Sequence, residues 1–195
     1  MAEQTRREAI LEAADRLFRH YGPQKTTMAD VAREASIGVG SVYLEFPSKD
    51  AVIEALSRGR YAAVLASMRE AATASGASSA ERLSRFFEAR TRGFLAMLDG
   101  GAHACDLLHC GSDAVKSAKT AYHEEERSIL TTLLHEGVAS GELSVADIDT
   151  TVRVLLLACS RFEPPWIAHA PTENVLADVA AMNALLLTGL LKRTG

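Results

Sequence analysis

The stretch DVAREASIGVGSVYLEF, residues 30–46, decides the fold of this chain. It begins with a helical pattern, passes through Gly38 and Gly40, and ends with two aromatic residues, Tyr43 and Phe46. Each glycine inside a helix costs roughly 1 kcal/mol relative to alanine, so a short helix should avoid two of them. We therefore expect these positions to need the absence of a side chain; the alternative is an ordinary loop.

Apolar residues at helical spacing on both sides of this stretch predict further helices. From Thr5 to Tyr21 they fall on one helical face, at positions 10, 13, 14, 17, 18 and 21, with Thr5 as a candidate cap. The next three helices are expected from Thr27, over about 38–44, and from Ser48 to about residue 70. Two short helices, joined by a tight turn and packed on a first helix, form the outline of a helix-turn-helix unit.

The rest of the chain also has a helical pattern, so we predict an all-α fold of about nine helices. The low-complexity stretch AATASGASSAE near residues 71–81 is expected to be a loop. Later helices are expected at about 80–99, 103–110, 113–139, 147–168 and 173–192. The predicted organisation is a DNA-binding domain over 1–47, a connecting helix over about 48–70, and a helical domain over 48–195.

Composition and charge limit the possible classes of protein. The net charge is −4, yet the first 60 residues hold nine Lys/Arg and nine Asp/Glu, so the excess acidity lies in the later part. This balance alone neither suggests nor excludes a nucleic-acid partner. The first dozen residues lack the apolar run of a secretory signal, and an odd number of cysteines, three, argues against a disulfide framework. We expect a soluble, cytoplasmic protein.

The segment TTMADVAREASIGVGSVYLEFPSKDAVIEAL, residues 26–56, resembles the DNA-binding segment of the tetracycline-repressor (TetR) family of transcriptional regulators. The preceding ILEAADRLFRHYG resembles that family's first helix, and together the two cover about residues 5–58. The resemblance implies DNA contacts from Thr26, Thr27, Gly38, Val39, Gly40, Ser41, Tyr43 and Lys49. Glu45 departs from the family pattern, which usually has His or Tyr before the phenylalanine. A carboxylate is repelled by a phosphate, so this phosphate contact is expected to be missing, and Glu45 is expected to face solvent or pair with an arginine.

Two apolar stripes lie near the C-terminus, one containing Leu155 and Cys159 and the other Val175, Val179, Met182, Leu186 and Leu190. They either fill the core of one subunit or form an interface between two. The resemblance favours the second choice, a homodimer through a four-helix bundle built from these residues. Two recognition units in a dimer would read a palindromic operator.

The resemblance also implies a small-molecule effector bound between the DNA unit and the dimer helices. Candidate lining residues are Phe86, Phe87, Phe94, Met97, Leu108, Tyr122, Arg161, Phe162 and Trp166. Most of these aromatics are expected in the core. Arg161 is more informative, because an arginine among apolar residues should reach water or pair with an anion.

Three other hypotheses accompany the predicted ligand-responsive repressor. The segment HACDLLHCG, with His103, Cys105, Asp106, His109 and Cys110, could bind zinc with help from His123, or Cys105 and Cys110 could sense redox state. The spacing typical of structural zinc sites is absent, so we predict no metal and no cofactor. An all-α carrier or enzyme is the rival class, but no nucleophile motif, paired carboxylates or phosphate-binding loop supports it.

Overall fold

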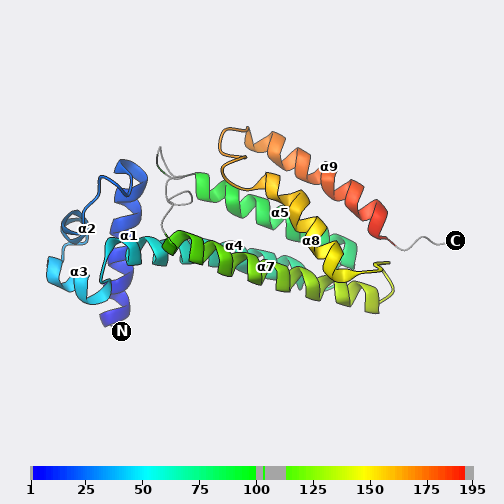
Figure 1. The fold of residues 1–195 in the computed structure, drawn as a ribbon, viewed down its shortest axis with the longest axis horizontal. Coiled ribbons are helices and arrows are strands. Elements are labelled where there is room, and N and C mark those ends of the chain that lie inside the picture. Colours follow the sequence, from blue (N-terminus) through cyan, green and yellow to red (C-terminus); the bar gives the residue numbers. More distant parts are fainter. Residues whose placement is uncertain (1, 100–102, 104–112, 192–195) are drawn as a thin grey trace. The chain divides into compact units, whose positions relative to one another are not determined.

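The computed structural model describes residues 2–99, 103 and 113–191. Within these ranges the regular structure is helical and no strand is formed, which confirms the predicted all-α fold (Figure 1). The helices are α1 (Ala2–Tyr21), α2 (Met28–Glu34), α3 (Val39–Glu45), α4 (Lys49–Ala72), α5 (Ser79–Leu98), α7 (Asp113–Ala139), α8 (Ile148–Cys159), the 3-10 turn η1 (Ser160–Phe162) and α9 (Thr172–Leu190). The helix expected at 103–110 falls outside the described residues.

The chain divides into two compact units. The first comprises Met1–Tyr61 and Met97–Thr120, and the second comprises Ala62–Ala96 and Ala121–Gly195. Helices α4, α5 and α7 therefore contribute residues to both units. The first unit extends further than the DNA-binding domain expected over 1–47, because the first turns of α4 share its core.

The core of the first unit is built on the apolar face of α1. Ile10, Ala13, Ala14 and Phe18 are fully buried, as their spacing predicts, whereas Tyr21 is exposed. They pack with residues of α2, α3, α4 and α7, namely Met28, Val31, Ala32, Val42, Phe46, Val52, Ile53 and Val115. Helix α1 begins at Ala2, so the expectation that Thr5 caps it was wrong. This core fixes α3 against α1.

Local capping sets the starts of three helices. The Thr27 hydroxyl accepts a hydrogen bond from the Asp30 amide at 3.2 Å, and the Asp30 carboxylate accepts one from the Thr27 amide at 3.0 Å. The same reciprocal pattern joins Ser78 and Glu81 at the turn before α5. Ser48 accepts from the Ala51 amide before α4. Each cap satisfies backbone donors that a helix otherwise leaves unpaired, which is why these starts were predictable.

The second unit contains α8, α9, the part of α5 up to Ala96, and parts of α4 and α7. Its buried residues include Phe86, Phe87, Leu130, Leu134 and Val152. Helices α4 and α5 approach closely at Gly93, where an added Cβ would lie 2.8 Å from a methyl of Val64. The helix expected over 147–168 ends at Cys159, because Pro164 and Pro165 cannot donate backbone hydrogen bonds.

Among the described residues, the helices are too short or too polar to cross a bilayer.

Candidate nucleic-acid interface and effector region

The turn between α2 and α3 is closed by backbone hydrogen bonds and by a residue in the left-handed region. The Ile37 amide donates to the Ala32 carbonyl at 3.0 Å, and Ser36 has φ 56°. Ile37 is half-buried against the core, and Val42 is fully buried one turn into α3. These two apolar residues hold α3 to the unit, as predicted, and leave its opposite face outward.

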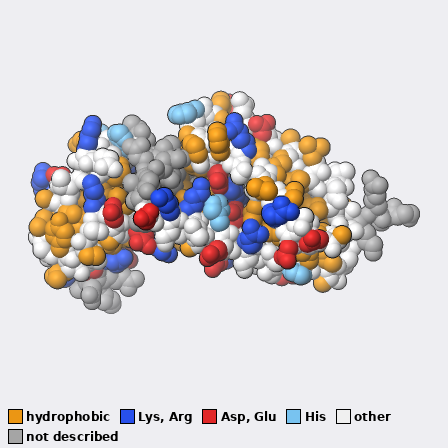
Figure 2. All heavy atoms as spheres, in the orientation of Figure 1, with side chains coloured by type: hydrophobic (Ala, Val, Ile, Leu, Met, Phe, Trp, Pro, Cys, Tyr) orange, Lys and Arg blue, Asp and Glu red, His pale blue; other side chains and the backbone are white. Residues whose placement is uncertain are grey.

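The outward face of α3 consists of Val39, Gly40, Tyr43 and Leu44. The side chains of Val39, Tyr43 and Leu44 are 42%, 51% and 83% exposed. Figure 2 shows hydrophobic side chains gathered where Figure 1 draws α3. Tyr43 has no hydrogen-bond partner among the described residues. This face therefore has little part in holding the fold together.

Neither glycine of this segment is required by the fold. A Cβ at Gly40 would have no neighbouring atom within 4 Å, and one at Gly38 would meet only the Ser41 hydroxyl oxygen at 4.0 Å. Gly38 is the N-cap of α3 with φ −68°, which any residue can adopt. No contact inside the molecule therefore accounts for the glycines, and the space beside them is open.

Glu45 is held by arginines from α1, one of the two arrangements expected. Its carboxylate lies 3.6 Å from the Arg6 guanidinium, and its backbone carbonyl accepts a hydrogen bond from Arg7 at 3.4 Å. The Arg7 guanidinium also stacks on the Phe46 ring, 4.2 Å from its centroid. The ion pair reduces the repulsion that Glu45 would exert on a nearby phosphate.

Lys49 and Thr26 act inside the first unit. The Lys49 ammonium donates to the carbonyls of Pro23 and Thr26, at 2.7 Å and 3.2 Å. An ammonium has three donors, so one remains for an outside acceptor. Thr26 is only 3% exposed, and its hydroxyl donates to the Gly22 carbonyl. The expected DNA contact from the Thr26 side chain is corrected for this reason: the side chain is buried and its hydroxyl is used in the loop.

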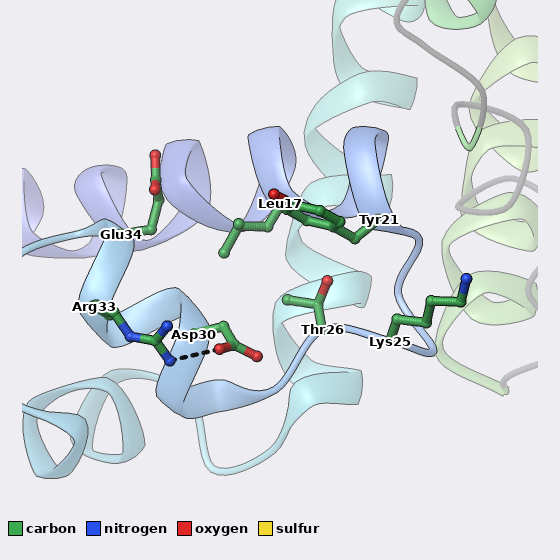
Figure 3. Close-up of a pocket in the computed structure, with 7 residues that line it drawn as sticks. All are labelled: Leu17, Tyr21, Lys25, Thr26, Asp30, Arg33 and Glu34. Carbon is green, nitrogen blue, oxygen red and sulfur yellow. Dashed lines mark hydrogen bonds and ion pairs between the residues drawn. The ribbon is translucent and has the colours of Figure 1, made fainter.

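An open groove of about 410 Å³ lies between α1 and the segment leading into α2 (Figure 3). It is lined by Leu17, Tyr21, Lys25, Thr26, Asp30, Arg33 and Glu34. Arg33 pairs with Asp30 at 2.7 Å, and hydrogen bonds from Thr27 lower the pKa of the Asp30 carboxyl. The exposed Lys25 has no partner among the described residues. The groove thus carries one unpaired cation close to the Thr27 cap.

In the second unit, Arg90 forms the centre of a buried polar cluster. Its guanidinium pairs with Glu126 of α7 and with Glu163, the latter at 2.9 Å, and donates to the carbonyls of Cys159 and Phe162. Tyr122 and His123 also hydrogen-bond to the Glu126 carboxylate, both at 3.0 Å. Arg90 therefore ties α5 to α7 and to the C-terminal end of α8.

The charges in this cluster are mutually stabilised. Burial would raise the pKa of Glu126, but hydrogen bonds from His123 and the charge of Arg90 outweigh it and hold that pKa below its usual value. Burial would likewise lower the pKa of Arg90, yet the Glu126 charge raises it. Burial raises the pKa of the Cys159 thiol to about 12, so this thiol stays protonated.

Arg161 reaches water, one of the two outcomes expected for it, whereas sequence reasoning did not identify the buried Arg90. Arg161 is exposed and stacks on Trp166, with its guanidinium 4.6 Å from the ring centroid. Arg90 continues the buried stripe of α5 that includes Leu83, Phe86 and Phe94. An arginine at that helical spacing was the signal that could have found it.

The other residues expected to line an effector pocket differ from one another in burial and do not all lie in the same unit. Phe86, Phe87, Phe94 and Tyr122 are buried in the second unit, and the rings of Phe94 and Tyr122 meet edge to face at 5.5 Å. Phe162 is half-buried, Trp166 is 60% exposed, and Met97 belongs to the first unit. Leu108 lies outside the described residues. The structure brings Phe94 and Tyr122 together with Arg90, rather than the full expected set.

The residues expected at a dimer interface mostly point into their own subunit. Leu155, Cys159, Val175 and Val179 are buried, whereas Met182, Leu186 and Leu190 are half-buried. The expectation of an interface through the four buried residues is corrected, because the second unit's own core covers them. The outward apolar residues on the same helices are Val154 and Leu157 of α8 and Leu185 of α9.

Most of the histidine–cysteine segment, including Cys105, Asp106, His109 and Cys110, lies outside the described residues. His123, considered as an additional ligand, hydrogen-bonds to Glu126. In the ranges that the structure describes, no group of three or more His, Cys, Asp or Glu side chains could hold a metal ion.

Comparison with known proteins gives matches to the helix-turn-helix segment and to the whole chain. Residues 10–56 match the family described as "Bacterial regulatory proteins, tetR family". The HTH-type transcriptional regulator TtgR of Pseudomonas putida is 40% identical over 55 residues, 28% of this chain and 26% of the relative. The HTH-type transcriptional repressor KstR2 of Rhodococcus jostii (strain RHA1) is 27% identical over 195 residues, covering 95% of this chain and 91% of the relative.

A solved structure is similar to this chain over almost its whole length. A transcriptional regulator of the TetR/AcrR family from Thermobifida fusca YX-ER1 superposes with a TM-score of 0.74 and 27% identity. The superposition covers 95% of this chain and 98% of the other. The likeness therefore includes the C-terminal helices as well as the helix-turn-helix segment.

Proposed function

This chain is a member of the TetR family of transcriptional regulators, and we propose on that premise that it is a ligand-responsive repressor. As a homodimer it binds a palindromic DNA operator in the cytoplasm, and a small molecule bound in the second unit releases it. The relatives described above are transcriptional regulators, and we infer no enzymatic activity.

The observation that carries this proposal is the outward face of α3. Its side chains are exposed, and the space beside Gly40 is open. A recognition helix must bring its backbone and side chains close to base edges in the major groove. We assign base contacts to Val39, Gly40 and Ser41, with bare backbone at Gly38 and Gly40 to allow the approach.

Phosphate contacts would surround this face. Tyr43 offers a free hydroxyl, Thr27 lies at the start of α2, and Lys49 retains one donor. Lys25 is added to the residues expected from sequence, because it is an exposed cation without a partner among the described residues. These contacts fix the position of α3 without reading the sequence.

We place the dimer contact on the exposed apolar side chains of α8 and α9. Leu157 and Leu185 are 62% and 77% exposed, and Ala158, Ala181 and Ala184 beside them are small and exposed. Small residues allow close helix approach, and large exposed leucines gain about 1.5–3 kcal/mol each when buried. The proposed interface therefore uses the outward sides of α8 and α9. The interface expected from the sequence used residues of these helices that mostly face the core of their own subunit.

The effector would act through the second unit by shifting a conformational equilibrium. We propose that it binds near the buried aromatics Phe86, Phe87, Phe94 and Tyr122 and the Arg90 cluster. Arg90 contacts both α7 and the end of α8, so a ligand that changes these contacts also changes the helix proposed for dimerisation. A coupling of about 1–3 kcal/mol between effector and operator is enough for a switch.

The proposal is tested by selecting bound sequences from a random double-stranded DNA pool with the full-length protein at two salt concentrations. We expect an enriched inverted repeat, with an affinity that falls as salt rises because phosphate contacts release counterions. Tyr43→Phe removes only a hydroxyl and should weaken binding to the selected operator several-fold. Ser67→Ala, which removes an exposed hydroxyl from α4 in the second unit, serves as the matched control.

The absence of any enriched repeat would contradict the proposal, provided that the protein is shown to be folded and dimeric. To exclude a retained effector, the selection is repeated after denaturation and refolding. A second negative result would rule out operator binding.

A further inference from the structure

The recognition segment lacks the side chains that usually read guanine and adenine. From Ala35 to Phe46 the sequence is ASIGVGSVYLEF, without lysine, arginine, asparagine or glutamine. In the major groove, Arg and Lys form paired hydrogen bonds to guanine, and Asn and Gln form them to adenine. Helix α3 can make neither kind of contact.

The acidic residue of α3 is also unavailable for base recognition. A free carboxylate can accept a hydrogen bond from the amino group of cytosine. The Glu45 carboxylate instead pairs with Arg6, and its side chain is only 11% exposed. Recognition of cytosine by this residue would require that pair to break.

Two aliphatic side chains remain on the outward face. Val39 and Leu44 are 42% and 83% exposed. The C5-methyl of thymine is the apolar group that a base edge presents in the major groove. Val39 is β-branched and has few rotamers, so it loses little side-chain entropy when it packs against such a methyl. Gly40 next to it leaves the backbone free to approach.

We propose that Val39 and Leu44 recognise the operator through thymine methyl groups, and that hydrogen bonds from α3 to bases contribute little to its specificity. This inference rests on the proposed function and names the chemistry that the same surface reads. Each half-site of the operator then contains thymines facing α3. The base contact of Ser41 then discriminates little between bases, and the hydroxyl of Tyr43 positions the helix on the duplex.

The test removes the methyl groups from the DNA while keeping every hydrogen-bonding group. The selected operator is synthesised with deoxyuridine in place of thymidine, one symmetric pair of positions at a time. Burying one methyl group contributes about 0.8 kcal/mol, so we expect about fourfold weaker binding per methyl and about fifteenfold per symmetric pair. The positions that respond identify the thymines that α3 reads.

A double-mutant cycle then assigns each methyl to its side chain. Val39→Ala and Leu44→Ala are compared on thymine and uracil operators, and the loss caused by uracil should shrink at least threefold in the variant whose side chain made the contact. Val138→Ala, at an exposed position in α7, is the matched control and should keep the full loss. A reduced loss in either α3 variant supports the proposal.

Two outcomes would overturn the inference while leaving the proposed function intact. One is an operator that binds well yet tolerates uracil at every thymine. The other is a uracil effect that is the same in both α3 variants as in wild type, because the methyls would then be read by another part of the protein. Failure to select any operator would instead contradict the proposed function.

Discussion

A substitution at Gly40 should have opposite effects on the stability of the protein and on its affinity for the operator. Alanine at this position should stabilise the free protein by about 0.5–1 kcal/mol, because it favours the helix and its Cβ meets no atom within 4 Å. The same methyl would stand between α3 and the DNA, so we expect operator binding to weaken about tenfold or more, equivalent to about 1.4 kcal/mol. Urea unfolding and operator titration at one salt concentration measure the two effects.

Gly59→Ala is the matched control for this substitution. Gly59 lies within α4 and also has open space around its Cβ position, so it should give a similar gain in stability without loss of operator affinity. If Gly40→Ala left operator affinity unchanged, the backbone of α3 would not approach the DNA closely.

Residues with local roles were the most predictable. The caps formed by Thr27 and Ser78 depend on neighbours three positions away, so their partners could be read from the sequence. The pairing of Lys49 with the Pro23 carbonyl joins residues 26 positions apart and had no local signal. The buried Arg90 was missed because burial depends on which helix packs over the side chain.

At the scale of helices, the buried cluster around Arg90 links three elements. Arg90→Met should destabilise the protein by about 3–5 kcal/mol, because it leaves the Glu126 carboxylate buried without its cationic partner. Urea unfolding at fixed protein concentration checks this value. Adding Glu126→Gln to Arg90→Met should recover part of the loss, since the uncompensated charge is then removed.

Arg92→Met is the comparison on the same helix. Arg92 forms an exposed pair with Glu88, and such pairs contribute little, so the change should stay within about 0.5 kcal/mol. Equal effects of the Arg90 and Arg92 substitutions would show that the buried cluster does not hold α5, α7 and α8 together.

Helix positions were predicted better than helix faces. The bounds of α7 agree with the expected 113–139, since periodicity and glycine stops mark them. The apolar residues of α8 and α9 were identified, but the sequence did not tell which side faces the subunit core. A helix with apolar residues on both sides has a periodic pattern that fits burial in either direction.

At the scale of the whole molecule, the outward residues of α8 and α9 should control assembly. Leu157→Glu would place a charge in the proposed interface twice, once from each subunit, so we expect at least a hundredfold rise in the dimer dissociation constant. Light scattering over a concentration series measures it. Operator affinity should fall with dimerisation, because a single recognition unit contacts one half-site.

Val138→Glu supplies the control, since this exposed valine lies on α7. It should remain dimeric at the concentrations where Leu157→Glu dissociates. A dimer unaffected by Leu157→Glu would contradict the proposed interface and direct attention to another surface.

The open surroundings of α3 bear on how operator preference could change during evolution. Val42 and Ile37 anchor the helix from within, while the residues that face outward contact little of their own protein. Substitutions on the outward face can therefore accumulate with little effect on the stability of the monomer. After gene duplication, a copy of this regulator could acquire a new set of target promoters without first gaining a stabilising change elsewhere.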